Sequence, residues 1–194
     1  MENLYSNLSK YINKNIIYYP KNLNCIKHKN IITHGHISLW NILKIKIINF
    51  ISQLFNCAYP HKFNYKLNNL NMSNIINTKY MFFCCKIFNQ PLNKLNISNV
   101  EDTGHMFYKC IKFNQLINTW NMSNVSSMKY MFNKCENFNQ ELNNWNVSNS
   151  KSFEDMFYYV KKFNKKLTNW ENNSKKKYIF INSYINEKFK PSFV

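Results

Sequence analysis

Side chains that can bind a metal ion gather near the N-terminus. They are Cys25, His28, His34 and His36, and their spacing is C-x2-H-x5-H-x-H. This spacing matches no common zinc pattern, and no second pair of cysteines accompanies it. A loop with ordinary histidines is the simpler interpretation, so we predict no metal and no cofactor.

Carboxylates that could act as a general acid and base are few. The two aspartates, Asp102 and Asp155, directly follow Glu101 and Glu154, at unequal positions of the repeat described below. Adjacent acids near the start of a helix more often interact with the helix dipole than with a substrate. The chain also has only two glycines, too few for a loop that holds phosphate. We therefore predict no catalytic residues and a protein that is not an enzyme.

Asparagine and serine recur at one spacing and are better candidates for function. An Asn-x-Ser-Asn segment returns every 25 residues, starting at residues 71, 96, 121 and 146. The first Asn and the Ser of each segment should lie on one face of a strand and point to solvent. Extended faces of repeat proteins commonly bind partners, although these side chains could also hydrogen-bond to each other along the repeats. The predicted protein-binding face comprises Asn71, Ser73, Asn96, Ser98, Asn121, Ser123, Asn146 and Ser148.

The last asparagine of each segment is predicted to be structural. Amide side chains stacked at equal spacing can bond to the backbone of the neighbouring repeat and so satisfy its polar groups. These residues are Asn74, Asn99, Asn124 and Asn149.

Apolar residues follow the same period. Phe-Asn pairs begin at residues 63, 88, 113, 138 and 163, and Met-Phe pairs begin at 81, 106, 131 and 156, each 25 residues after the last. A period in this range is typical of a solenoid, in which neighbouring repeats share one continuous core. With 45% hydrophobic residues, the chain has enough apolar material for that core.

Each repeat divides into two halves. In Leu142-x-x-Trp145-x-Val147, polar and apolar residues alternate, which is typical of a half-buried strand. From Val125 to Cys135, apolar residues come every three or four positions, which fits a short helix or 3₁₀ turn. The sequence therefore predicts an α/β repeat, a right-handed leucine-rich-repeat-like solenoid with short parallel strands and short helices.

Domain boundaries follow from where the repeat begins and ends. Residues 1–39 do not fit it and are predicted to be an N-terminal cap or extension. A degenerate copy begins at Trp40, so residues 40–170 should form the solenoid of about five 25-residue repeats. Residues 171–194 lose the pattern and are predicted to be a C-terminal cap and tail that folds back over the last coil.

The cysteines of the repeats point to a packing role. Cys85, Cys110 and Cys135 lie 25 residues apart, and Val160 takes the equivalent position in the next repeat. A position that also accepts valine is a small buried apolar site. We therefore predict reduced thiols rather than disulfides.

The chain is strongly basic. Its net charge is +17, all 26 basic residues are lysine, and 37 residues are asparagine. Lys and Asn have AT-rich codons, so a biased genome is the simplest cause, and the charge alone is weak evidence for nucleic-acid binding. Lysines cluster between residues 161 and 177, where they indicate either a solvated cap or a phosphate-binding patch with Tyr158, Tyr159 and Phe163.

The repeated residues resemble a known type of repeat. The pattern FNQxLNxWNVSNVxxMxxMFxxC, over about residues 54–170, is similar to the BspA-like leucine-rich-repeat-related units of bacterial surface proteins. It is also similar to the tryptophan-repeat proteins of insect poxviruses, and the AT bias and short length look more like this viral group. The resemblance implies an interaction protein that has no catalytic residues.

The expected function follows from these features. The most hydrophobic stretch, Ile37–Tyr59, contains lysines and is a poor membrane span, and the N-terminus lacks the apolar core of a signal peptide. We expect a cytoplasmic protein, in the host cytoplasm if the source is a virus. It should be a non-enzymatic protein–protein interaction module that presents its polar face to an unidentified protein, a host protein in the viral case. The alternative is a Lys-rich protein that binds nucleic acid or an anionic surface.

Overall fold

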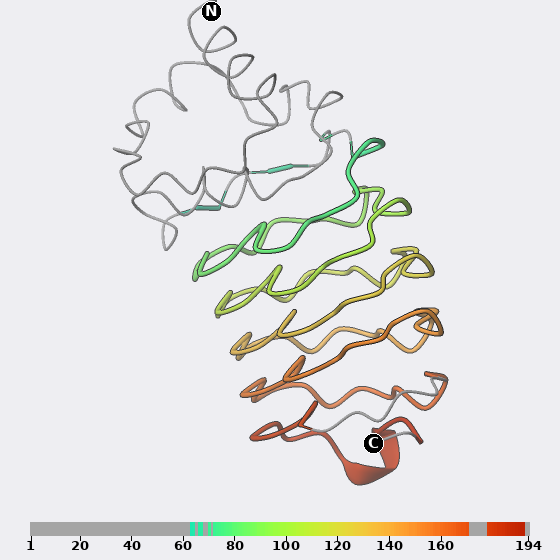
Figure 1. The fold of residues 1–194 in the computed structure, drawn as a ribbon. Helices are drawn as coiled ribbons and strands as arrows, with labels where there is room; N and C mark the ends of the chain where they lie inside the picture. The colour runs from blue at the N-terminus through green and yellow to red at the C-terminus, as the bar shows by residue number, and fades with distance from the viewer. Residues whose placement is uncertain (1–62, 65, 68–69, 71, 171–177, 193–194) are drawn as a thin grey trace, which may run out of the picture.

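The chain winds into a stack of similar coils (Figure 1). The computed structural model describes residues 63–64, 66–67, 70, 72–170 and 178–192. Backbone hydrogen bonds join equivalent parts of neighbouring coils. Thr78 N, for example, donates to Asp102 O at 2.9 Å, and Thr103 N donates to Ser127 O at 3.0 Å. One coil therefore takes one repeat. The predicted N-terminal cap, the first repeat and the cysteine–histidine segment lie outside the described residues.

Regular secondary structure is scarce in the described part of the chain. Its one helical element there is η3 (Glu187–Phe189), a 3₁₀ helix whose N-cap Asn186 accepts a hydrogen bond from Lys188 N. β-Structure is limited to isolated parallel bridges that link one residue per coil. The bridges join Asn77 to Asp102, Asp102 to Ser127, and Ser127 to Ser152.

The second half of each repeat, for which the sequence predicted a short helix or 3₁₀ turn, forms consecutive tight turns. Met81 N donates to Thr78 O within the coil, whereas Tyr80 N donates to Gly104 O of the next coil. Tyr80 and Cys84 have φ of 63° and 60°, which a right-handed helix excludes. Successive turns and helices share an apolar spacing of three or four residues, so the pattern alone does not separate them.

The first half of each repeat also differs from the expected strand. Trp145 N donates to Leu142 O and Ser150 N donates to Val147 O, so this stretch is two turns. Trp145 and Val147 are nevertheless both buried, because the two turns direct alternate side chains inward. The leucine-rich-repeat-like class and its handedness stay predictions, while the stacking of coils at the predicted period is observed (Figure 1).

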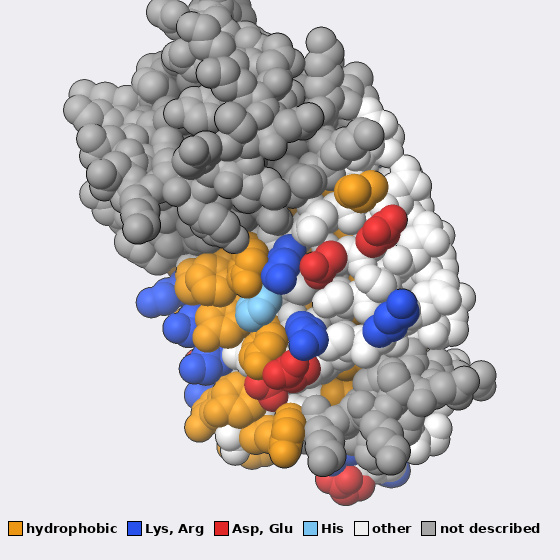
Figure 2. Space-filling view, in the orientation of Figure 1, with side chains coloured by type: hydrophobic (Ala, Val, Ile, Leu, Met, Phe, Trp, Pro, Cys, Tyr) orange, Lys and Arg blue, Asp and Glu red, His pale blue; other side chains and the backbone are white. Residues whose placement is uncertain are grey.

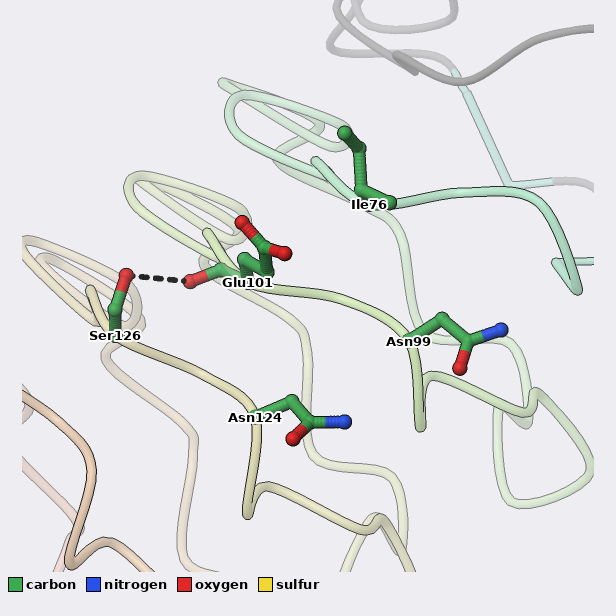
Figure 3. A pocket seen from close by; sticks show the side chains of 5 residues that line it. All are labelled: Ile76, Asn99, Glu101, Asn124 and Ser126. Atoms are coloured by element: carbon green, nitrogen blue, oxygen red, sulfur yellow. Dashed lines mark hydrogen bonds between the residues drawn. The ribbon is translucent and has the colours of Figure 1, made fainter.

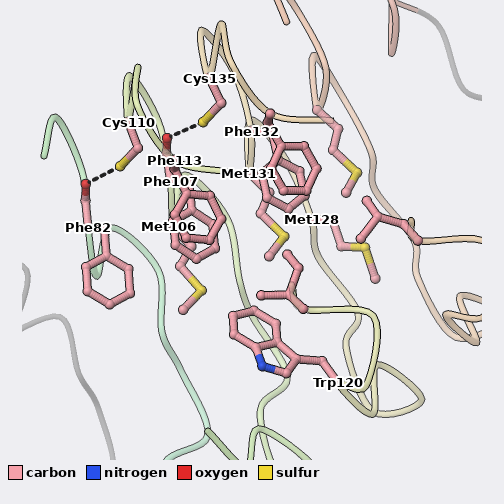
Figure 4. Packing of buried hydrophobic residues seen from close by; sticks show 14 of the residues in the cluster. Phe82, Met106, Phe107, Cys110, Phe113, Trp120, Met128, Met131, Phe132 and Cys135 are labelled. Carbon is pink, nitrogen blue, oxygen red and sulfur yellow. Dashed lines mark hydrogen bonds between the residues drawn. The ribbon is translucent and has the colours of Figure 1, made fainter. Parts of the chain in front are cut away.

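Stacked phenylalanine rings form the centre of the core (Figure 4). The Met-Phe pairs supply one column, in which successive ring centroids lie 5.3–5.6 Å apart. Rings of the Phe-Asn pairs lie beside it, and Phe113 is 4.1 Å from Phe107. Such offset contacts between large rings stabilise the core beyond the effect of area burial. The first column consists of Phe82, Phe107, Phe132 and Phe157, continued by Phe180.

Tryptophan ties each coil to the one before it. The indole Nε1 groups of Trp120, Trp145 and Trp170 donate to the carbonyl oxygens of residues 92, 117 and 142 at 3.1, 3.0 and 2.9 Å. All three side chains are buried, and a buried indole N–H needs such an acceptor. The predicted neighbours Trp145 and Trp170 are confirmed, with ring centroids 6.2 Å apart.

The repeated cysteines are buried free thiols, as predicted. Cys85, Cys110 and Cys135 are fully buried, and none of them forms a disulfide. Cys110 Sγ contacts Phe82 O and Cys135 Sγ contacts Phe107 O, one coil earlier (Figure 4). Burial raises the pKa of these three thiols well above the usual range. They are therefore neutral packing groups and not nucleophiles.

Residues 178–192 cover the last full coil and continue the stack by a further partial coil (Figure 1). Phe157 N donates to Ile179 O, and Phe180 stacks on Phe157 with centroids 5.4 Å apart. The buried contacts come from residues 179, 180 and 185. The side chains of Tyr178 and Tyr184 do not take part and are 60% and 74% exposed.

Trp120 should be a major determinant of stability. Its side chain is 4% exposed, so Trp120→Ala is expected to lower the free energy of unfolding by about 3–5 kcal/mol. Trp120→Phe keeps most of the ring but loses the indole hydrogen bond, while Leu92 O still accepts from Leu95 N. This change should therefore cost less, about 0.5–1.5 kcal/mol. Chemical denaturation measures both.

The control for this prediction is Leu116→Ala. Leu116 is 56% exposed, so the change should alter stability by less than about 0.5 kcal/mol. A Trp120→Ala variant no less stable than Leu116→Ala contradicts the buried, hydrogen-bonded role of the indole.

Candidate functional site

Asparagines of the Phe-Asn pairs form a ladder along the stack. The Oδ1 atom of each accepts a hydrogen bond from the backbone N of the equivalent Asn one coil later, at 2.9–3.0 Å. At Asn114, Gln140 Nε2 also donates to Oδ1, at 2.8 Å. The bond from each Asn side chain to the backbone of the next Asn explains why Asn follows each Phe. The ladder runs through Asn64, Asn89, Asn114, Asn139 and Asn164 and ends on Asn186.

A second asparagine ladder confirms a predicted structural role. The Nδ2 groups of Asn99, Asn124 and Asn149 each donate to a backbone oxygen of the preceding coil at 2.7 Å. The acceptors are the carbonyls of residues 73, 98 and 123. These asparagines therefore bond between coils.

The predicted protein-binding face has a different bonding pattern. Asn96, Asn121 and Asn146 are exposed, and their Oδ1 atoms accept hydrogen bonds from the backbone N of the serine two residues later, at 3.0, 3.1 and 3.1 Å. These contacts stay within one coil. Among the described residues, none accepts a hydrogen bond from the Nδ2 groups of these three asparagines. Asn71 lies outside the described residues.

A shallow recess lies between this face and the turns. It has a volume of about 450 Å³ and is lined by Ile76, Asn99, Glu101, Asn124 and Ser126 from three successive coils (Figure 3). Ser126 Oγ donates to the backbone oxygen of Glu101 at 3.1 Å. Glu101 is the one ionisable group among the lining residues, so the recess brings together no acid–base pair.

The two acidic pairs of the sequence lie in separate coils and have structural contacts. Asp102 Oδ1 accepts a hydrogen bond from Gly104 N at 2.7 Å. Glu154 lies 2.8 Å from Lys129 Nζ and accepts from Tyr130 Oη at 2.9 Å. Lys129 and Tyr130 hold the pKa of Glu154 below its usual value, and the same hydrogen bond raises the pKa of Tyr130 to about 12. Among described residues, no group of three metal-binding side chains is found.

His105 occupies the centre of a partly exposed ring stack. Its ring lies 4.7 Å from that of Tyr80 and 4.6 Å from that of Tyr130, both nearly parallel to it. Its Nδ1 atom is buried without a hydrogen-bond partner. Burial lowers the pKa of His105, and the nearby charge of Lys79 lowers it further. The stacking of these rings could not be predicted from the sequence.

Two overlapping stretches, residues 21–121 and 94–190, match a family described as Mycoplasma protein of unknown function, DUF285. The chain belongs to the DUF285 family. This is a repeat family related to the BspA-like repeat proteins, and the two matches begin close to three repeats apart, as a stack of equivalent coils allows. No curated protein and no solved structure gives a significant match. Within the described residues, no helix is both long and apolar enough to cross a membrane.

The lowered pKa of His105 should make stability depend on pH. Below its usual pKa of 6.5 the unfolded chain takes up a proton at this position, while the folded chain does not until its lower pKa is reached. His105 therefore contributes stability above pH about 6.5 that is lost as the pH falls. His105→Tyr, which matches Tyr80 and Tyr130, should remove this loss.

Melting temperatures of wild type and His105→Tyr, measured between about pH 7.5 and 5.5, check this prediction. The advantage of the variant should grow as the pH falls. The other histidines are the same in both proteins and cancel in the comparison. A difference that does not change with pH contradicts the lowered pKa.

The Phe-Asn ladder should be needed for stability. Asn114→Ala leaves the backbone N–H of Asn139 without its acceptor, which should cost about 1–3 kcal/mol in the free energy of unfolding. Gln140 Nε2 keeps the backbone oxygen of residue 114 as an acceptor. Asn114→Asp keeps an acceptor oxygen and should lose less. Exposed Asn144→Ala is the control and should stay within about 0.5 kcal/mol of wild type. Equal losses for Asn114→Ala and Asn114→Asp would argue against the ladder.

Proposed function

We propose that the chain is a non-enzymatic protein–protein interaction module that presents the row of Asn96, Asn121 and Asn146 to a partner. The supporting observation is that the asparagine rows differ in their hydrogen bonds. Asn99, Asn124 and the Phe-Asn ladder bond from coil to coil. Within the described part of the chain, the exposed row bonds instead to the serines of its own coil. The stack therefore does not need the amide groups of the exposed row.

The local bonds also orient the exposed amides. Because each Oδ1 is held by a serine N–H, the Nδ2 donors are fixed in similar positions on successive coils. A fixed donor loses less side-chain entropy on binding than a mobile one. Such a row suits the carbonyl and carboxylate oxygens of a protein partner.

The family match leaves open the type of relative, the cellular compartment and the partner, and the proposal includes all three. Within the DUF285 family, we take the likeness to BspA-like surface proteins and insect-poxvirus tryptophan-repeat proteins as support for an interaction role. The cytoplasm is the compartment that fits the buried free thiols, and a host protein would be the partner if the source is a virus.

The alternative function, binding of nucleic acid or an anionic surface through the C-terminal lysines, has less support. Phe163 is fully buried in the core and offers no ring to a base. Lys161 and Lys165 pair with Glu136 and Glu141 at 2.8 and 3.0 Å. The lysines at 175–177 lie outside the described residues.

An isosteric double variant tests the exposed row. Asn121→Asp with Asn146→Asp keeps the Oδ1 acceptor and the side-chain volume but replaces each outward donor by an acceptor. We expect an unchanged melting temperature and the loss of cellular proteins that wild type retains in a pull-down at moderate salt. Asn137→Asp with Asn144→Asp, which changes the charge equally outside the row, should retain them.

Two outcomes contradict the proposal. Retention of the same proteins by both double variants would show that the row does not bind them. Binding that disappears steeply with added salt and is competed by DNA would favour the phosphate-binding alternative, because counterion release makes such binding salt-dependent.

A further inference from the structure

A second surface, formed by the other half of each repeat, combines aromatic rings with lysines. In Figure 2 hydrophobic side chains, the one histidine in view and several lysines lie together along one edge of the stack. The rings are half-buried or exposed, so they belong to the surface rather than to the core. We call this surface the aromatic edge; it comprises Tyr80, Phe83, His105, Tyr108, Tyr130, Tyr158 and Tyr159, with Lys79, Lys109 and Lys134.

The rings of the aromatic edge stack on one another from coil to coil. His105 has a ring on both faces, at 4.7 and 4.6 Å, and Tyr108 lies 4.8 Å from Phe83 with an interplanar angle of 8°. Tyr158 and Tyr159, in contrast, meet edge to face at an interplanar angle of 62°. In the two parallel stacks, one or both faces of each ring are therefore covered by a neighbouring ring. What they present to solvent is mainly ring edges, which carry the positive end of the aromatic quadrupole.

Lysine ammonium groups lie next to the same rings. Lys109 Nζ is 5.3 Å from the centroid of Tyr108, and Lys134 Nζ is 5.9 Å from that of Tyr159. Tyr159 is 40% exposed. Among the described residues, neither Lys109 nor Lys134 forms a salt bridge with a carboxylate. The aromatic edge thus combines unpaired positive charge with positive ring edges.

We propose that the aromatic edge binds an acidic protein segment that carries aromatic side chains. Its carboxylates would pair with Lys109 and Lys134. Its rings would place their negative faces on the exposed ring edges in T-shaped contacts. Tyrosine-rich surfaces of this kind are enriched at protein interfaces. Single-stranded nucleic acid fits less well, because bases stack on free ring faces. Here a neighbouring ring or a lysine ammonium group lies over at least one face of Tyr80, His105, Tyr108, Tyr130 and Tyr159.

This inference is independent of the exposed Asn row. The two surfaces come from different halves of the repeat and recognise different chemistry, neutral hydrogen-bond acceptors in one case and acidic aromatic groups in the other. Either surface could fail its test without affecting the other.

The test uses the full chain and defined polymers. The probe is a random copolymer of glutamate and tyrosine, compared with polyglutamate and with single-stranded oligo(dT), with affinities measured by isothermal titration calorimetry at low salt. The copolymer should bind about tenfold more tightly than polyglutamate, because only it supplies rings. Tyr108→Leu should reduce that preference.

A matched pair of charge reversals locates the site. Lys109→Glu with Lys134→Glu should weaken copolymer binding by about tenfold or more. Lys112→Glu with Lys162→Glu changes the net charge equally at exposed positions outside the aromatic edge, and should weaken binding by less than about threefold through the general field. If a Glu variant melts below wild type, the corresponding Gln substitutions replace it.

Several results would overturn the proposal. Absence of copolymer binding, equal affinity for copolymer and polyglutamate, or equal losses in the two lysine pairs would each do so. Tighter binding of oligo(dT) that is lost in Tyr108→Leu would assign the aromatic edge to nucleic acid instead.

Discussion

Each coil of this stack carries backbone N–H groups that only the neighbouring coil can satisfy. Tyr80 N donates to Gly104 O and Phe82 N to Met106 O, at 3.1 and 2.8 Å. Asn89 N donates to a side-chain oxygen, Asn64 Oδ1. In a helix, by contrast, backbone groups are paired within one element. A single coil would expose these groups and both faces of its rings, so the coils form together or not at all.

The same turns impose backbone strain at two positions of every coil. Eight non-glycine residues there have φ between 49° and 63°. Left-handed backbone costs about 1–2 kcal/mol for such residues, and glycine would avoid the cost. Glycine stands at none of the eight positions. The residues found there are Tyr80, Cys84, His105, Lys109, Tyr130, Lys134, Asp155 and Tyr159. Most of them supply the aromatic edge, so much of that surface is built on strained backbone.

The period of the sequence was sufficient to predict what packs inside. It identified the phenylalanine and tryptophan columns, and the equivalence of Cys135 and Val160 identified a buried thiol site. The period also identified Asn99 and Asn124 as residues that form hydrogen bonds between coils. It could not distinguish turns from a short helix, because that choice depends on φ at Tyr80 and its equivalents, and apolar spacing carries no information about φ. Whether the exposed asparagines bind a partner stays a prediction.

The aromatic edge could not be predicted from the sequence for a related reason. Core positions keep an apolar residue in almost every repeat, whereas the edge positions change between aromatic, basic and acidic residues from coil to coil. One column of the edge consists of Tyr80, His105, Tyr130 and Asp155. Because these residues differ in type, a repeat defined by identical residues does not include this column. In a stack whose coils contact only their neighbours, the uniform positions hold the coils together and the variable ones are free to differ. The surface that distinguishes one partner from another is therefore expected among the variable positions, where the rings and unpaired lysines of this chain are found.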